Sequence, residues 1–192
     1  MWWILILIVA VIALVLFGVS AFNKLRRLDI LAQEALGGID VQLTRRADLV
    51  PNLVETVKGY AAHEKGLFEE VTAARAGVAA ATQSGTVEQR AEAEAALDRA
   101  LVHVMAVAEN YPDLKASTNF LDLQRQLADT ENQLAFARQY YNDAVSSLNT
   151  AVATVPTMFF TGVAGVSRRA FYQAPADDTA PPQVSFEGPA GP

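Results

Sequence analysis

The N-terminal part of this 192-residue chain is an almost unbroken apolar segment. In residues 2–22 only Gly18 and Ser20 are not hydrophobic, and the first formally charged side chain belongs to Lys24. An α-helix rises about 1.5 Å per residue, so roughly 20 such residues cross the ~30 Å hydrocarbon core of a bilayer. The segment therefore predicts one transmembrane helix, residues 1–23, that anchors the rest of the chain.

Two other interpretations of the apolar segment are weaker. A cleaved signal peptide has a basic start, a shorter apolar stretch and a cleavage site of small residues. Here Trp2 and Trp3 follow the initiator directly, and an amphipathic pattern continues past residues 19–21, which only faintly resemble a cleavage site. A buried core helix would need a larger domain to surround it. We therefore expect an uncleaved anchor.

The basic residues beside the anchor predict its orientation. Lys24, Arg26 and Arg27 follow the apolar segment, and no basic residue precedes it. The positive-inside rule then predicts a single-pass protein of the cell (inner or plasma) membrane, with its N-terminus outside and the following domain in the cytoplasm. Trp2 and Trp3 suit the opposite interface as aromatic anchors.

The composition of the chain excludes several classes of function. The 15 basic and 21 acidic residues give a net charge of −6, which argues against a nucleic-acid partner, because phosphates require a basic face. Cysteine is absent, so disulfides, thiolate nucleophiles and thiolate metal sites are excluded. The roughly 170 residues after the anchor are enough for one domain with a core.

Helical periodicity dominates residues 24–110. Leu25, Leu28, Ala32, Ala35 and Ile39 are spaced by three and four, which predicts that the anchor helix continues out of the membrane. We expect an interruption at residues 37–38, both glycine, as a bend or a site of close packing. A new helix should begin at Pro51 and carry Tyr60, and one long helix kinked at Pro51 is the alternative. Residues 83–86 predict a turn, with Gly85 and Thr86 as caps.

The clearest pattern in the chain lies between a break at residues 111–113 and Pro156. Large side chains recur there every seven residues, with mostly small residues interleaved, which predicts a long helix that a partner helix can approach closely. The large positions are Phe120, Leu127, Leu134, Tyr141, Leu148 and Val155. The interleaved positions are Leu123, Thr130, Ala137, Ala144 and Ala151.

Residues 158–166, after Pro156, are apolar again. They either cap the open end of a helical bundle or contact the membrane surface, and Phe159 and Phe160 with Arg168 and Arg169 are the candidate membrane-interface residues. From residue 174 onward Pro, Gly, Ala, Asp and Thr dominate, a composition that buries too little surface to fold. Residues 24–173 are thus the expected helical domain, and residues 174–192 the expected disordered tail.

No pattern of catalytic or metal-binding residues emerges. The zinc-protease motif that His63-Glu64 would start needs a second histidine where Leu67 stands, and no glutamate lies three residues before His63 or His103, as a di-iron bundle requires. We expect no metal, no cofactor and no enzymatic activity. Polar groups beside the heptad seam are the candidate partner surface or, alternatively, a buried hydrogen-bonding layer. They are Arg45, Arg46, Glu131, Asn132, Tyr141, Asn142 and Asp143.

Three segments together resemble one family, the LemA family proteins. They read IDVQL and DLVPNLVETVKGY, with two arginines between them (residues 39–60), AENYPDLKA (residues 108–116), and TEN, AFAR and YNDAV (residues 130–145). The resemblance extends from the anchor to residues 182–186. Ala47 departs from the pattern, because a polar residue such as histidine is expected there, and this weakens any metal-binding role for the position.

The resemblance implies an all-α fold in which the transmembrane helix continues into an antiparallel, up-and-down (bromodomain-like) four-helix bundle. It carries over no catalytic residue. We therefore predict a membrane-anchored helical scaffold or adaptor that contacts the lipid bilayer and either self-associates or docks membrane partners. The alternative is a sensor or ligand-binding module that uses the polar seam groups around Arg46, Glu131 and Asn142.

Overall fold

The computed structural model describes residues 1–173, and every regular element within that range is a helix. The predicted disordered tail, residues 174–192, lies outside the described residues. The elements are α1 (Trp2–Lys58), α2 (Lys65–Ser84), α3 (Val87–Ala108), the single-turn α4 (Pro112–Lys115), α5 (Thr118–Ala153), the 3₁₀ turn η1 (Thr157–Phe160) and the short α6 (Thr161–Ala164).

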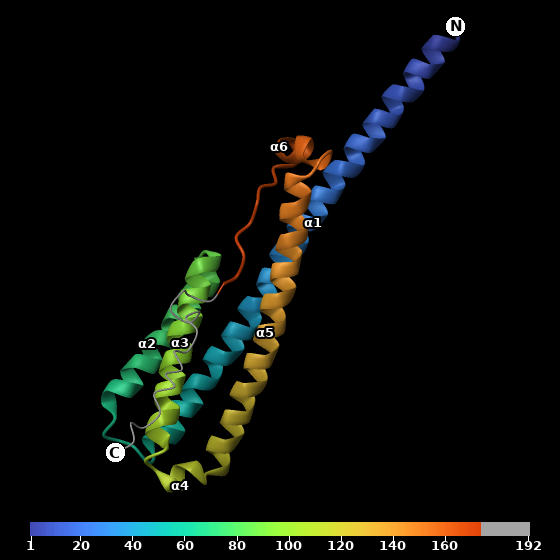
Figure 1. The fold of residues 1–192 in the computed structure, drawn as a ribbon. Helices are drawn as coiled ribbons and strands as arrows, with labels where there is room; N and C mark the ends of the chain where they lie inside the picture. Colours follow the sequence, from blue (N-terminus) through green and yellow to red (C-terminus); the bar gives the residue numbers. More distant parts are fainter. Residues whose placement is uncertain (174–192) are drawn as a thin grey trace, which may run out of the picture.

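Helix α1 is 57 residues long and has two parts of opposite character. Residues 2–20 are almost entirely exposed although nearly all of them are apolar, and this part extends alone beyond the other helices (Figure 1). From Ala21 onward α1 buries a residue about every three or four positions, including Leu25, Ile39 and Leu43. The prediction of an all-helical chain with one long apolar N-terminal helix is confirmed.

The predicted interruption at Gly37–Gly38 and the predicted helix start at Pro51 are wrong, whereas the alternative of one long helix through Pro51 agrees with the structure. The helix passes through Gly37, Gly38 and Pro51 without ending. A proline in a helix removes the hydrogen bond to the carbonyl four residues earlier, which here belongs to Ala47. The Nε of Arg75 on α2 donates to that carbonyl oxygen at 3.2 Å, so the unpaired acceptor is satisfied from a neighbouring helix. A contact between helices thus allows α1 to continue through Pro51.

The first true break in the helical path follows Lys58. Gly59 caps α1, the amide of Ala61 donates to the carbonyl of Val57 at 2.8 Å, and α2 begins only at Lys65. Tyr60, which was expected on the buried side of a helix through this region, is exposed in the connection. The predicted single helix from Pro51 to the turn at residues 83–86 is therefore two pieces that belong to α1 and α2.

The later boundaries fall where the sequence predicts them. Gly85 follows α2, and Thr86 caps α3 through a reciprocal pair of hydrogen bonds with Gln89. Along α5 the large heptad side chains from Phe120 to Leu148 are buried, and Ala137 is the one interleaved position that is only partly buried. Val155, the last predicted heptad position, lies beyond the end of α5 and is exposed.

The long helices pack in two pairs. Helix α5 returns along α1 over most of its length, and α2 and α3 form a second pair that packs against the half of α1 far from the N-terminus (Figure 1). The η1 and α6 turn packs against α1 near the point where α1 extends beyond the other helices (Figure 1). Residues 166–173 then run back between α5 and α3, and we call this segment the strap.

Candidate functional site

A charged cluster lies where α1, α3 and α5 meet. Arg46 of α1 is buried and donates through Nη1 to Glu131 Oε2 of α5 at 2.6 Å. The same nitrogen forms an ion pair with Asp98 of α3, although the contact lacks hydrogen-bond geometry. On α5, Arg138 pairs with Glu94 of α3 and with Glu131, the latter at 3.1 Å. Two guanidinium groups, on α1 and α5, thus bridge three carboxylates on α3 and α5.

The strap completes this charged cluster. Its Tyr172 is buried, and Tyr172 Oη donates to Glu94 Oε2 at 2.5 Å. Burial raises the pKa of Glu94, an effect that the tyrosine hydrogen bond and Arg138 oppose without cancelling. Burial likewise raises the pKa of Asp98 against the attraction of Arg46. Burial, reinforced by the neighbouring Glu94, also raises the pKa of Tyr172, so its hydroxyl stays protonated and can donate.

The charged cluster has a geometry that suits structure better than metal binding. Glu94, Asp98 and Glu131 each present an oxygen, and these oxygens lie within 4.8 Å of one another. Each carboxylate, however, already contacts Arg46 or Arg138. Partly buried ion pairs of this kind add little net stability, because the cost of removing the charges from water offsets their attraction. The cluster joins α1, α3, α5 and the strap through side-chain contacts.

The strap is held by two asparagines that lie seven residues apart on α5. Asn142 accepts from the Tyr172 amide at 2.8 Å and donates to the Tyr172 carbonyl at 3.0 Å. Asn149 forms the same pair of hydrogen bonds with Arg169, both at 2.9 Å. Between them, Tyr141 Oη donates to the carbonyl of Ala170 at 2.8 Å. The polar positions of the heptad helix thus bind the backbone of this chain's own extended segment.

The remaining residues predicted for the polar surface do not join the charged cluster. Arg45 reaches Gln133 at 3.2 Å on the exposed side of the α1–α5 pair. Asn132 and Asp143 are exposed. The prediction did not include Glu94, Asp98, Arg138 or Tyr172. The one sequence signal for the first two is their spacing, because an acidic pair four residues apart interrupts the alanine-rich face of α3.

The two histidines are exposed and lie in different elements. His63 is exposed in the connection between α1 and α2. His103 of α3 is also exposed, and its Nδ1 contacts Glu70 of α2 at 2.9 Å. The His103–Glu70 contact ties the surfaces of α2 and α3 together.

The candidate membrane-interface residues have different environments. Phe159 is 72% exposed, whereas Phe160 packs edge-on against Phe17 of the apolar segment with ring centroids 6.0 Å apart. Arg168 is exposed, whereas Arg169 donates to Asp29 of α1 at 2.8 Å. One phenylalanine and one arginine therefore hold the turn and the strap to α1, and the other two face outward.

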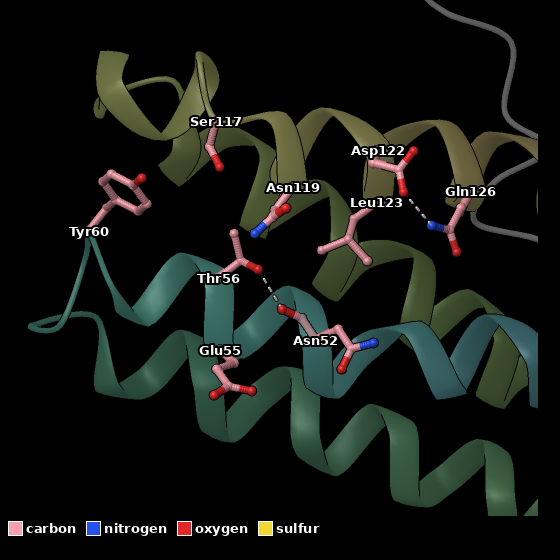
Figure 2. Close-up of a pocket in the computed structure, with 9 residues that line it drawn as sticks. All are labelled: Asn52, Glu55, Thr56, Tyr60, Ser117, Asn119, Asp122, Leu123 and Gln126. Carbon is pink, nitrogen blue, oxygen red and sulfur yellow. Dashed lines mark hydrogen bonds between the residues drawn. The ribbon is translucent and has the colours of Figure 1, made fainter.

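An open polar groove lies at the end of the α1–α5 pair far from the N-terminus. It has a volume of about 570 Å³, with Glu55 and Tyr60 on the α1 side and Asn119 and Asp122 on the α5 side (Figure 2). Within it, Gln126 donates to Asp122 at 2.8 Å (Figure 2). The groove is lined by two carboxylates and no basic residue, so it would favour a polar or cationic ligand.

Taken together, the long apolar helix, the interhelical charged cluster and the polar strap contacts define a helical, membrane-associated protein. Residues 1–173 hold no recognisable catalytic constellation. The chain belongs to the LemA family, whose family model matches residues 35–186. The resemblance drawn from the sequence is therefore confirmed.

The chain is also similar to characterised magnetosome proteins. It is 24% identical to magnetosome protein MamQ of Magnetospirillum gryphiswaldense over 172 residues, which cover 77% of this chain and 63% of the relative. It is 23% identical to magnetosome protein MamQ 2 of Paramagnetospirillum magneticum over 196 residues, covering 90% of this chain and 72% of that relative. The chain thus spans a little under two thirds of the first relative's length. None of these names describes an enzymatic activity.

Proposed function

We propose that this protein is a membrane-anchored helical scaffold whose domain associates with a second copy of the same chain. In this proposal the anchor is residues 1–23 of α1, and the four long helices act as an antiparallel, up-and-down (bromodomain-like) bundle. The exposed Lys24, Arg26 and Arg27 directly after the span support a cytoplasmic domain in the inner or plasma membrane. The proposal assigns no catalytic residue and no cofactor.

One observation carries the proposal: the α1–α5 pair has an exposed apolar face on the side away from the charged cluster. Val41 of α1 is 62% exposed, and on α5 Phe136 is 74% and Tyr140 55% exposed. The Arg45–Gln133 hydrogen bond joins the two helices on this side. Residues three to four and seven positions along a helix share a face, so Val41 lies level with Phe136, and Gly37–Gly38 lie level with Tyr140. We call these five residues the outer face.

The two glycines of the outer face have no packing explanation within residues 1–173. Glycine inside a helix costs about 0.5–1 kcal/mol relative to alanine. Among these residues, a Cβ atom added at Gly37 or at Gly38 would meet nothing within 4 Å, so no described segment approaches closely enough to require either glycine. Exposed aromatic rings beside a shallow strip of backbone provide both halves of a helix–helix contact, a protruding side chain and a surface to receive it.

Membrane anchoring favours a second copy as the partner. Two chains held in one membrane share their orientation and their height, so a twofold axis between them runs along the membrane normal. Residues at one height in the first copy then face the same height in the second. Tyr140 of one chain would therefore meet Gly37 and Gly38 of the other, and the contact would occur twice by symmetry.

Cysteine crosslinking tests this contact directly, because the natural chain has no cysteine. Single variants Val41→Cys and Phe136→Cys would be expressed in the full chain and treated in native membranes with a short bis-maleimide. Val102→Cys, on α3 and 68% exposed, is a control of similar exposure on another surface. We expect crosslinked dimers from the first two variants and only monomer from the control.

Two further measurements separate specific association from chance collisions. Crosslinking of Phe136→Cys should persist when added lipid lowers the density of the chain in the membrane. It should fall when the second substitution Tyr140→Ala is introduced into the same chain. If all three cysteine variants give the same yield, or if every variant stays monomeric, self-association through the outer face is wrong. The scaffold would then need a different partner surface.

The open groove at the far end of the α1–α5 pair supports a second candidate function, a ligand-binding module. The predicted sensor surface around Arg46, Glu131 and Asn142 is occupied by ion pairs and by the strap, so the groove lined by Glu55 and Asp122 is the better location. A cationic metabolite library screened by thermal shift would detect binding, and Asp122→Asn should abolish it. If no compound gives a shift that Asp122→Asn removes, the groove is not a ligand site.

A further inference from the structure

We infer that the chain touches the bilayer a second time, through the exposed apolar side chains of the η1–α6 turn. This contact does not depend on self-association and rests only on α1 being inserted in a membrane. Phe159 and Val163 are 72% and 79% exposed, and Met158 and Val155 beside them are also exposed. We call these four residues the turn patch.

The position of the turn patch along α1 argues for lipid as its partner. Phe160, next to Phe159, packs against Phe17, and a Cβ atom on Gly18 would lie 3.3 Å from the Phe160 ring. Phe17 precedes Lys24, the first charged residue, by seven positions, or about 10 Å of helix at 1.5 Å per residue. The turn therefore reaches past the first charge to the level of the apolar segment. Interfacial helices bury their apolar face to a depth of about 5–10 Å.

The chemistry of the turn is compatible with that depth. Residues 144–167 contain no charged side chain. Polar groups inside a membrane need internal partners, and the hydroxyls here have them: Thr157 Oγ1 donates to the carbonyl of Ala151 at 2.5 Å, and Thr161 Oγ1 donates to that of Met158 at 2.9 Å. The turn thus exposes hydrocarbon while its hydroxyl groups are satisfied internally.

Basic residues mark the level at which the lipid headgroups would begin. Lys24 and Arg27 are exposed on α1 directly after the span. The ion pair between Arg169 and Asp29 holds the start of the strap five residues beyond Lys24, and the exposed Arg168 lies beside it. The order along the membrane normal is therefore turn patch, then basic residues, then charged cluster. That order fits a bilayer containing anionic lipid better than it fits a water-exposed loop.

Site-directed spin labelling measures the depth of the turn patch in the full chain. Phe159→Cys and Val163→Cys, each as the only cysteine, would be labelled with a nitroxide and reconstituted in vesicles of phosphatidylcholine and phosphatidylglycerol. Val9→Cys in the apolar segment is the lipid-facing reference, and Val102→Cys on α3 is the water-facing reference. All four positions are exposed, so the labels should not disturb packing.

Power saturation with oxygen and with a water-soluble nickel chelate measures how accessible each label is from lipid and from water. We expect the labels at 159 and 163 to resemble the label at 9, with high oxygen and low nickel accessibility. Labels that resemble the one at 102 would overturn the inference. Labels shielded from both reagents would instead indicate coverage by a second copy of the chain, which also overturns it. If the label at 9 is itself accessible to nickel, α1 does not span the bilayer and the inference fails with it. Crosslinking of Phe136→Cys is measured independently, so the absence of self-association would not change the conclusion from the spin labels.

Discussion

The two faces of the α1–α5 pair reverse the usual distribution of polarity. The inner face, toward α3 and the strap, buries Arg46 and Glu94 within a network of ion pairs. The outer face exposes Val41, Phe136 and Tyr140. Buried charges are rare unless they are paired, whereas scattered exposed apolar residues are common. What distinguishes the outer face is that three such residues flank two unexplained glycines.

The difference between the faces separates two tasks that a scaffold must perform. The inner face pairs its charged groups with one another and binds the strap, although Arg46 Nε, Arg138 Nε and Asp98 Oδ1 lack hydrogen-bond partners among the described residues. We therefore expect it to favour one register of the helices and one position for the strap. The outer face leaves apolar side chains exposed to water, which favours association with another surface. Substitutions on the inner face should therefore change folding, and substitutions on the outer face should change association.

The largest effect is expected on the inner face from Arg138→Met. This variant keeps most of the side-chain volume but leaves Glu94, which is buried, without its guanidinium partner. Breaking one side of a buried pair costs about 3 kcal/mol. Chemical denaturation of the full chain in detergent, followed by circular dichroism, measures the loss.

Arg125→Met is the matched control for Arg138→Met, because Arg125 lies on the same helix and its ion pair with Asp122 is exposed. Exposed pairs contribute less than about 1 kcal/mol. If the two variants unfold at the same denaturant concentration, the charged cluster does not specify the inner face.

A smaller effect is expected from Asn142→Ala, which removes both hydrogen bonds to Tyr172 of the strap. At about 1 kcal/mol for each hydrogen bond, the local cost is about 2 kcal/mol. Hydrogen exchange should accelerate at the Tyr172 amide while the amides within α1 keep their protection. Asn132→Ala on the exposed side of α5 is the control, and equal exchange in both variants would mean that the strap is held by other contacts.

Local patterns in the sequence predicted the helical class, the turn at Gly85 and the buried heptad positions of α5, because each of these depends on residues close together in the chain. The path of α1 through Pro51 could not be predicted in this way. It depends on Arg75, which reaches the Ala47 carbonyl from another helix. Local rules treat proline as a helix boundary because they do not include a donor from a distant segment.

Two of the five charged residues of the cluster could be anticipated from local patterns in the sequence. Arg46 and Glu131 lie beside recognisable seams, so their polarity draws attention. Glu94 and Asp98 resemble ordinary surface charges on an alanine-rich helix, and the burial of Glu94 depends on contacts with Arg138 of α5 and Tyr172 of the strap, which are distant in sequence. The exposed outer face was also not predicted, because a heptad pattern identifies the side that packs and says nothing about the opposite side.

The outer face should respond to Gly37→Ala with Gly38→Ala in two opposite ways. Alanine raises helix propensity, so each substitution should stabilise the isolated chain by about 0.5–1 kcal/mol. The added methyl groups would fill the strip that receives Tyr140 of the second copy, so crosslinking through Phe136→Cys should fall. Denaturation in detergent and crosslinking in membranes measure the two effects. A pair of alanines that raises stability and leaves crosslinking unchanged would remove the glycines from the contact.

The smallest effect concerns the pH dependence of the inner face. The pKa of Glu94 is raised above its ordinary value of 4.5, chiefly by burial. A carboxyl group with a raised pKa binds its proton more tightly in the folded state, so its contribution to stability is fully present below the unfolded pKa and is lost as the pH rises through the folded pKa. On acidification from neutral pH toward 4.5, the wild type should therefore gain stability relative to Glu94→Gln, which does not titrate at this position. Parallel denaturation series across this range measure the difference between the two chains. A constant difference would show that Glu94 has the same proton affinity in both states, and the Tyr172 hydrogen bond and Arg138 would then offset its burial completely.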